Sequence, residues 1–484
     1  MKRLLRTLIL LLVRLLGAPG TRSAAKSLNK TPTAGPYMLL LRPDHLGDLV
    51  LTTPILQALK QNAPDAHITM MVGPWSSEII ARHPSIDRLL TCPFPGFLRT
   101  PQKALAPYIL LFSIAKQLRR DHYDLAIHLR PDFWWGAALL YLAGIPCRIG
   151  YDLEPGKPFL THALPPLQQP EHVTVSNLRL TSAALQASGY PPLAEPYTPE
   201  RYPLQFIPTP AEHQWVTNRL AQEGIASSYI VGAGLVPALN KPGVPAFHEP
   251  GASALQEPTP IVVIHPGSGA AVKLWRTRGW ATCADILTGL CPTGEDERAT
   301  ISAHPSQPHL PHPYGYGIPL EGWRTTLESL TTPAPVHIIL TGSKNEQPML
   351  EEIARGMHSP AVLVTDATVG QLAALLGRAL LVLSVDSGPL HLAVAQGTPT
   401  VQLFGPTDPR IFGPWGMHER HIVLASTQRC PSCPAIPCGR LDFSPQELAD
   451  HPCVRLITEQ QVLEAVDKLA PHLYRDAGIG QKTP

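Results

Sequence analysis

The chain has 484 residues, 44% of them hydrophobic, so it is long enough for two domains, each with its own core. Its formal net charge is only +2, which excludes the strongly basic surface typical of nucleic-acid-binding proteins, and we expect no nucleic-acid partner. Eight cysteines in a chain of this length do not by themselves indicate a disulfide-stapled fold.

The N-terminal stretch MKRLLRTLILLLVRLLGAPG predicts a helix that lies in the plane of a membrane. Its longest apolar run, Leu8–Val13, is too short to span a bilayer. At helical spacing most leucines share one face, while Arg3, Arg6 and Arg14 gather on the other, where anionic headgroups would meet them. A cleaved signal peptide is the alternative, because basic residues precede the apolar run. We assign residues 1–34 to this helix and a linker.

Residues 35–202 alternate between apolar strand patterns and helical patterns. The strand candidates are YMLLLRP, HITMMVG, IDRLLTC, YDLAIHLRP and CRIGYD, and the helix candidates are LTTPILQALKQNAP and GAALLYLAGI. Alternation of this kind predicts an α/β domain, in which helices cover both faces of a parallel sheet.

A second alternating region covers residues 261–484, after a Pro/Gly-rich stretch at 203–260 that we expect to be an irregular linker. Its strand candidates are IVVIHPGSG, VHIILTGS, AVLVTDAT, ALLVLSVDSG and TPTVQLFGP. Residues 291–322 are polar, rich in Pro, Gly and His, and without periodicity, so we interpret them as a surface insertion whose histidines are solvated. The chain therefore predicts two α/β domains, whose ligands would bind beyond the carboxyl ends of the strands.

Capping signals mark three helices of the second region. Thr368 and Gln371 form a capping box at the start of TVGQLAALLG. Ser444 and Glu447 form another around Pro445, and TEQQVLEAVDKL reads as a capped helix near the C-terminus.

The strand LLVLSVDSG ends in a turn suited to an anion. Asp386 and Ser387 come first, Gly388 lets a ligand approach the backbone, and the following helix would direct its free amides at a phosphate. Ser387 could instead simply cap that helix. His391, one turn further on, either points back to the ligand or is a packed, hydrogen-bonded histidine.

Two further turns resemble it in composition. The strand TPTVQLFG ends near Thr407 and Asp408, beside the first turn if the two strands are neighbours. The stretch IHPGSGAAVKLW closes a third strand, and Lys273 in it is either a phosphate partner or a solvated surface lysine. Glu346, after the strand VHIILTGS, could accept hydrogen bonds from a ribose.

Asp48 follows the first strand of the N-terminal domain, in the stretch RPDHLGD. At the start of a helix its carboxylate would stabilise the helix dipole. The same carboxylate at a ligand site could take a proton from an attacking hydroxyl. The residues alone favour the first interpretation.

Three stretches together resemble glycosyltransferase family 9, whose best-known members are the lipopolysaccharide heptosyltransferases. They are LLLRPDHLGDLVLTTPILQALKQNAPDAHITMMV, IVVIHPGSGAAVKLW and SVDSGPLHLAVAQGTPTVQLFGPTDP, within residues 37–416. The resemblance implies an α/β GT-B fold of two doubly wound, Rossmann-like domains facing across a cleft. It also implies inverting sugar transfer from a nucleotide-diphospho-sugar, with no cofactor required for catalysis.

The resemblance further implies roles for residues at the strand ends. Asp48 matches the general base, Lys273 the lysine on the donor phosphates, and Glu346 the acid on the nucleotide ribose. The remaining donor-binding candidates are His265, Gly267, Ser268, Asp386, Ser387, Gly388, His391, Thr407 and Asp408. Arg42, Arg130 and Arg148 are candidates for binding an anionic acceptor, although each could equally be structural.

A cysteine cluster near the C-terminus consists of Cys430, Cys433, Cys438 and Cys453. A C-x-x-C pair with two later cysteines suits a structural zinc ion or an iron–sulfur cluster. Free thiols are the alternative, and we expect no role for them in catalysis.

We therefore expect a cytoplasmic glycosyltransferase, held peripherally at the inner face of the cell membrane. Its expected partners are a nucleotide-diphospho-sugar donor and a lipid-linked saccharide acceptor, with ADP-heptose and lipopolysaccharide core suggested by the resemblance. One alternative is a nucleotide-sugar epimerase of the same fold, which would need no acceptor. Another is a non-catalytic membrane scaffold that binds nucleotide sugars.

Overall fold

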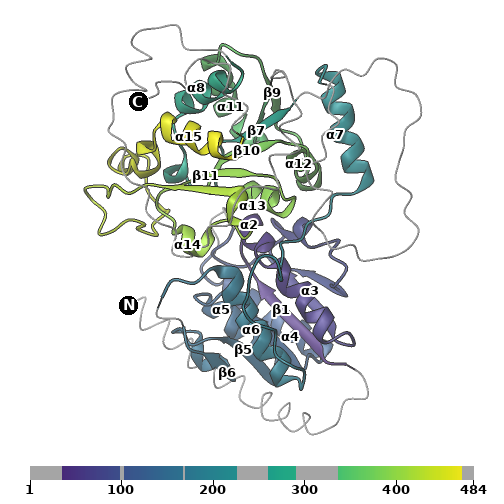
Figure 1. Cartoon of the computed structure of the whole chain (residues 1–484). Helices are drawn as coiled ribbons and strands as arrows, with labels where there is room; N and C mark the ends of the chain where they lie inside the picture. Colours follow the sequence, from purple (N-terminus) through teal and green to yellow (C-terminus); the bar gives the residue numbers. More distant parts are fainter. Residues whose placement is uncertain (1–34, 99–102, 167–168, 226–259, 290–335, 471–484) are drawn as a thin grey trace, which may run out of the picture. The chain divides into compact units, whose positions relative to one another are not determined.

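A computed structural model describes residues 35–98, 103–166, 169–225, 260–289 and 336–470. The chain divides into two compact units, Met1–Phe206 and Ile207–Pro484 (Figure 1). The N-terminal segment 1–34, the insertion 291–322 and most of the linker 203–260 lie outside the described residues. No described helix combines the length and the apolar character that crossing a bilayer requires.

The first unit is built on a parallel sheet with the strand order β3-β2-β1-β4-β5-β6. Its strands are β1 (Tyr37–Arg42), β2 (His67–Val72), β3 (Arg88–Thr91), β4 (Leu125–His128), β5 (Cys147–Tyr151) and β6 (His162–Leu164). The central strands are buried on both faces, as their continuous apolar runs predict.

Helices cover both faces of this sheet. They are α2 (Leu46–Val50), α3 (Thr53–Asn62), α4 (Ala106–Leu118), α5 (Trp134–Leu142) and α6 (Val173–Ala187), with short 3-10 helices η1 (Ser77–Ile79), η2 (Arg119–Asp121) and η3 (Lys157–Phe159). Leu39 and Leu41 pack into one core cluster with α4 and α5. Met38 and Leu40 alternate to the opposite face, which α3 and α6, packed on each other, cover.

The second unit repeats this topology with the strand order β12-β11-β10-β7-β8-β9, again all parallel. Its strands are β7 (Ile261–His265), β8 (His337–Thr341), β9 (Ala361–Val364), β10 (Leu381–Val385), β11 (Thr400–Phe404) and β12 (His421–Ala425). In both units the chain starts at a central strand, builds outward to one edge and then returns to build the other half. This is the doubly wound Rossmann arrangement.

The helices of the second unit are α7 (Pro210–Gln222), α8 (Thr277–Leu287), α11 (Gln347–Gly356), α12 (Val369–Leu376), α13 (Gly388–Ala395), α14 (Pro409–Phe412) and α15 (Glu459–Leu469). Its 3-10 helices are η4 (Ala271–Lys273), η5 (Lys344–Glu346), η6 (His418–Arg420), η7 (Glu447–Asp450) and η8 (Cys453–Leu456). The Asp285 carboxylate of α8 accepts hydrogen bonds from the backbone amides of His358 and Ser359, at 2.8–3.0 Å, and from both of their side chains.

Helix α7 corrects one expectation, because it lies within the stretch predicted to be irregular. Thr209 caps it, the Glu212 carboxylate accepts the reciprocal bond from the Thr209 amide at 2.6 Å, and Pro210 occupies the first turn. The helix packs on α12, where a Cβ on Gly370 would overlap Glu212. The capping signal T-P-x-E was present in the sequence, but the surrounding prolines obscured it.

The predicted caps of two other helices are confirmed, and the third prediction is confirmed only in its reciprocal bond. Thr368 with Gln371 and Thr458 with Gln461 form complete capping boxes. Around Ser444 the reciprocal bond from the Ser444 amide to Glu447 forms at 2.9 Å, yet only the short η7 follows. Pro452 comes soon after this turn, and a proline cannot continue an α-helix.

Candidate active site

Four turns meet at one edge of the second unit's sheet, at the carboxyl ends of β7, β8, β10 and β11. The register pairs Ser384 with His265 and Val385 with Leu403, so the turns that follow these strands are neighbours. The expected adjacency of the Asp386 turn and the Thr407 turn therefore holds.

Asp386 joins three of these turns through its own polar atoms. Its Oδ2 accepts hydrogen bonds from Lys273 Nζ and from Thr407 Oγ1, both at 2.6 Å, and its backbone oxygen accepts one from Ser268 Oγ at 3.2 Å. The Asp386 side chain is 8% exposed and that of Lys273 is 15% exposed. The carboxylate therefore holds the lysine in place at the mouth of the strands.

Helix α13 begins directly behind this carboxylate. Ser387 occupies the N-cap position, but its hydroxyl makes no capping bond within the described residues and instead bonds Ser384 Oγ at 3.0 Å. Pro389 lies in the first turn, where a proline costs no helical hydrogen bond. The amides of a first helical turn have no partner inside the helix, so they and the positive end of the dipole favour an anion.

His391 is a buried residue of α13, 3% exposed. Burial lowers its pKa to about 4, against a smaller opposing effect of Asp386, so the ring is neutral at physiological pH. Its Nδ1 has no hydrogen-bond partner among the described residues. The geometry is that of a packed histidine, and its predicted contact with the donor stays a prediction.

The turns after β7 and β8 hold the remaining donor candidates. His265 is buried and bonds Thr341 Oγ1 through Nδ1 at 3.0 Å, and burial lowers its pKa to about 4. Glu346 Oε2 accepts bonds from the backbone amide of Ser343 at 2.7 Å and from its hydroxyl at 2.8 Å. A Cβ on Gly267 would lie 2.1 Å from Glu346 Oε1, so this position admits only glycine while the carboxylate keeps its place.

Asp408 has a local role in the turn after β11. Its Oδ1 caps α14 by accepting from the Arg410 amide at 2.9 Å, and its Oδ2 pairs with Arg410 Nη2 at 2.6 Å. Burial would raise the pKa of Asp408, but the bonds from Arg410 outweigh it and lower that pKa. The predicted donor contact of Asp408 stays a prediction.

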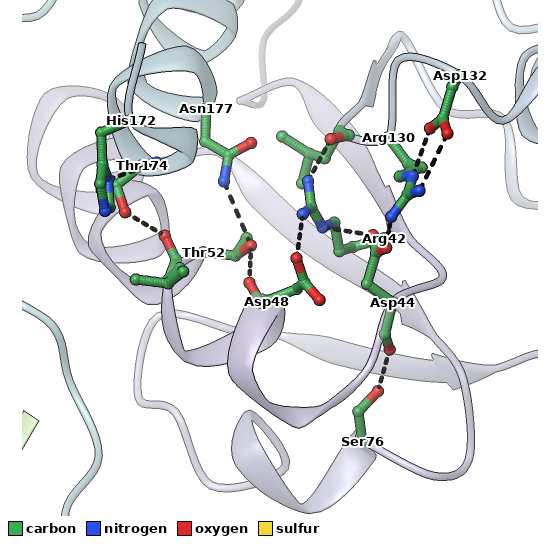
Figure 2. Close-up of polar contacts among 12 residues, drawn as sticks. Arg42, Asp44, Asp48, Thr52, Ser76, Arg130, Asp132, His172, Thr174 and Asn177 are labelled. Atoms are coloured by element: carbon green, nitrogen blue, oxygen red, sulfur yellow. Dashed lines mark hydrogen bonds and ion pairs between the residues drawn. The ribbon is translucent and has the colours of Figure 1, made fainter. Parts of the chain in front are cut away.

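A second polar cluster lies at the carboxyl edge of the first unit's sheet, around Asp48 (Figure 2). Arg42 lies between two carboxylates, with Nε 2.7 Å from Asp44 Oδ2 and Nη2 3.1 Å from Asp48 Oδ1. Arg130 Nη1 bonds the other Asp44 oxygen, and its Nη2 donates to Asp132 Oδ2 at 3.0 Å. One chain of ion pairs therefore links β1, α2 and the loop after β4.

The two aspartates of this cluster differ in environment. Asp44 is buried, and burial raises its pKa although Arg42 and Arg130 act in the opposite direction. The Asp48 side chain is 25% exposed and accepts the Arg42 bond on Oδ1. Thr52 Oγ1 donates to the Asp48 backbone oxygen at 2.7 Å, which fixes the turn of helix that carries this carboxylate.

The three acceptor candidates are not equally accessible. Arg42 is 2% exposed and Arg148 is 5% exposed. Arg148 donates to the backbone oxygens of Ile145 and Phe159, and burial lowers its pKa. Arg130 keeps about a third of its side chain exposed, at 34%. Their contact with an acceptor stays a prediction, and burial argues against it for Arg42 and Arg148.

Of the four predicted cysteines, the described structure groups Cys430 and Cys433, without Cys438 and Cys453, together with His451, which the sequence analysis did not single out. Ligand atoms of Cys430, Cys433 and His451 all lie within 4.8 Å of one another, and Cys433 Sγ is 3.2 Å from His451 Nδ1. Burial, and to a smaller extent the neighbouring cysteines, raise the pKa of Cys433 to about 11 and that of Cys453 to about 12. His451 was missed because the sequence analysis considered only the cysteines of this stretch, although His451 lies two residues before Cys453.

Comparisons with known proteins show which sequences this chain resembles. The model for "Glycosyltransferase family 9 (heptosyltransferase)" matches residues 319–438. An Escherichia coli lipopolysaccharide heptosyltransferase 3 is 25% identical, with 88% of this chain and 96% of that protein covered. A Haemophilus ducreyi lipooligosaccharide heptosyltransferase 2 is 24% identical, with 77% and 84% covered.

Solved structures show the fold. The family 9 glycosyltransferase of Veillonella parvula has a TM-score of 0.58 at 19% identity, with 90% of this chain and 97% of that chain covered. The E. coli ADP-heptose heptosyltransferase II has a TM-score of 0.54 at 17% identity, with 90% and 99% covered. The predicted α/β fold of the GT-B class is confirmed.

Proposed function

We propose that the chain is a heptosyltransferase-like glycosyltransferase of family 9 and that it moves heptose from ADP-heptose to a lipid-linked saccharide such as lipopolysaccharide core. The reaction inverts the anomeric centre. The observation that carries the proposal is the convergence of three turns on Asp386, which holds Lys273 at 2.6 Å beside the start of α13.

The donor diphosphate is the anion that this edge suits. Lys273 supplies a positive charge, and its ammonium has three N–H donors, of which Asp386 engages one. The free amides of α13 supply further donors and the positive end of a helix dipole. Together they stabilise the charge that develops on the leaving diphosphate, so this scheme requires no metal ion.

Asp48 serves as the general base. Its carboxylate takes the proton of the acceptor hydroxyl while the hydroxyl oxygen attacks the anomeric carbon. The bond from that carbon to the β-phosphate oxygen breaks, and its electron pair leaves with ADP. Arg42 acts through Asp48, because its bond to Oδ1 orients the carboxylate.

The acceptor is attached to lipid, so the enzyme works at a membrane surface. Residues 1–34 supply the peripheral contact at the inner face, through the apolar face and the arginines of their predicted helix. The protein is then cytoplasmic and peripheral.

The cysteine cluster binds a structural zinc ion in this proposal. Tetrahedral zinc with sulfur ligands at about 2.3 Å places its ligand atoms roughly 3.8 Å apart. The ligand atoms of Cys430, Cys433 and His451 all lie within 4.8 Å of one another, which is compatible with three ligands of one such ion. Metal analysis of the purified protein and the effect of a chelator on its melting temperature test this. Absence of metal, with an unchanged melting temperature, would assign the cysteines as free thiols.

A panel of ADP-, UDP- and GDP-linked sugars tests the donor, because a ligand that binds the folded state raises the apparent melting temperature. ADP-heptose is expected to stabilise the protein most, and heptose should appear on a lipid-linked acceptor with inverted configuration. Conversion of a nucleotide sugar without acceptor would support the epimerase. Donor binding without turnover, at saturating acceptor, would support the non-catalytic scaffold.

A further inference from the structure

Helix α4 exposes a stripe of large apolar side chains. Leu105 at its N-cap is 69% exposed, Ile109 is 68% exposed and Phe112 is 41% exposed. Their spacing of four and three residues places them on one face. The opposite face packs into the core through Leu111 and other buried residues. The helix is therefore apolar on both sides, although one side has no cover among the described residues.

The charged side chains of residues 103–120, the segment that contains this stripe, are all basic. Residues 106–118 contain no acidic side chain. Lys116 lies in the last turn on the same face as the stripe, and the exposed Arg119 and Arg120 follow directly. The nearest acid along the chain, Asp121, is engaged by Arg88 at 3.1 Å. An apolar stripe that ends in basic residues matches an anionic lipid surface.

The position of α4 in the fold relates it to the proposed base. The helix connects β3 to β4, and such crossover helices begin at the carboxyl edge of the sheet. Trp135, in the first turn of the helix after β4, donates from Nε1 to the Pro107 backbone oxygen at 2.9 Å. The N-terminal end of the stripe therefore lies at the carboxyl edge of the sheet, the edge that carries Asp48 and Arg130.

We propose that the exposed face of α4 is a membrane contact, which inserts Leu105, Ile109 and Phe112 at the headgroup–acyl boundary of an anionic bilayer. Its purpose rests on the proposed function, because a bilayer at this face brings a lipid-linked acceptor to the edge that carries Asp48. Other occupants fit less well. Residues 1–34 contain basic residues and no acid, so they would repel the Lys116 end of the stripe. A second copy would bring the same like charges.

The first test is co-sedimentation of the full-length chain with vesicles of phosphatidylcholine, with and without phosphatidylglycerol. Replacing Ile109 and Phe112 together by serine should lower partition into the mixed vesicles roughly tenfold or more, since two buried apolar side chains are lost. Ile207→Ser is the matched control, because Ile207 is 74% exposed in the other unit, and it should leave partition unchanged. Lys116→Ala should weaken binding to the anionic vesicles alone, and more at low salt.

The second test detects contact directly on bound protein, so it does not depend on how strongly residues 1–34 bind. Phe112→Trp should add fluorescence that brominated lipid quenches, whereas Ile207→Trp should add fluorescence that it does not quench. If the added fluorescence of the vesicle-bound Phe112→Trp variant stays unquenched, or if the full-length protein fails to bind vesicles, the proposal is overturned. Loss of a dimer in sedimentation velocity for the double serine variant would assign the stripe to a second copy. ADP-heptose thermal shifts of the same variants report separately on the proposed function.

Discussion

Substituting Asp48 by asparagine separates catalysis from stability. The change removes the only group in the proposed scheme that can accept the acceptor's proton, and loss of a general base costs about 10²- to 10⁴-fold in rate. That corresponds to about 2.7–5.4 kcal/mol of transition-state free energy. The loss in the free energy of unfolding should be much smaller. The side chain is 25% exposed, its bond to Arg42 is 3.1 Å long, and an asparagine oxygen can still accept that bond. We expect about 1 kcal/mol or less.

The assay combines heptose transfer at saturating donor and acceptor with thermal unfolding in the presence and absence of ADP-heptose. The rate should fall at least a hundredfold while the stabilisation by ADP-heptose stays the same, because the donor turns lie in the other unit. Asp132→Asn is the matched control, since Asp132 belongs to the same ion-pair cluster but is 66% exposed and pairs with Arg130. It should keep the rate within about threefold. An Asp48→Asn variant that retains a tenth of the rate would refute the base assignment.

Three further predictions concern the second unit. Lys273→Met should weaken ADP-heptose binding at least tenfold in a thermal-shift titration and cost up to about 3 kcal/mol of stability, because it strands a buried carboxylate. Asp285→Asn should cost roughly 2 kcal/mol at pH 7; burial would raise the pKa of Asp285, but hydrogen bonds to the carboxylate lower it below 3.8. This stabilisation is complete above pH 3.8 and is lost as the pH falls through the lower folded-state pKa, so melting temperatures of variant and parent should converge there. Gly405→Ala should cost about 1–3 kcal/mol, because a Cβ there lies 2.3 Å from the Val454 side chain, whereas Gly269→Ala, with nothing within 4 Å of its Cβ, should not.

The sequence predicted the parts of the fold that depend on local pattern. Continuous apolar runs such as that of β1 identify buried parallel strands, and a turn of small and polar residues marks where each one ends. Because all the strands are parallel, these turns must share an edge. The contact between the turns of Lys273 and Asp386 was therefore foreseeable as proximity, although 113 residues separate the pair.

The sequence could not predict which polar residues would saturate one another. Arg42 was a candidate for binding the sugar acceptor, yet it is buried between Asp44 and Asp48. His451 joins the cysteines only through folding of the C-terminal segment. Which side chains form hydrogen bonds or ion pairs depends on their distances in the folded structure, and the hydrophobic periodicity of the sequence contains no information about those distances. Helix α7 was missed for a different reason. Its capping box was present in the sequence, but the Pro/Gly-rich composition of the surrounding stretch led to the prediction of an irregular linker.

Each unit has a cation–carboxylate pair at the carboxyl edge of its sheet, but the two cations differ in how many N–H donors they leave for a ligand. In the first unit Arg42 is 2% exposed and divides its guanidinium among Asp44, Asp48 and the Leu129 backbone oxygen, so it can only position its neighbours. In the second unit Lys273 keeps 15% of its surface, and two of its three N–H donors have no partner among the described residues. A carboxylate beside a diphosphate site would repel its ligand if it were unpaired. Asp386 is paired with Lys273 at 2.6 Å, so it instead holds the ammonium group in place and sets the direction in which its two other N–H groups point.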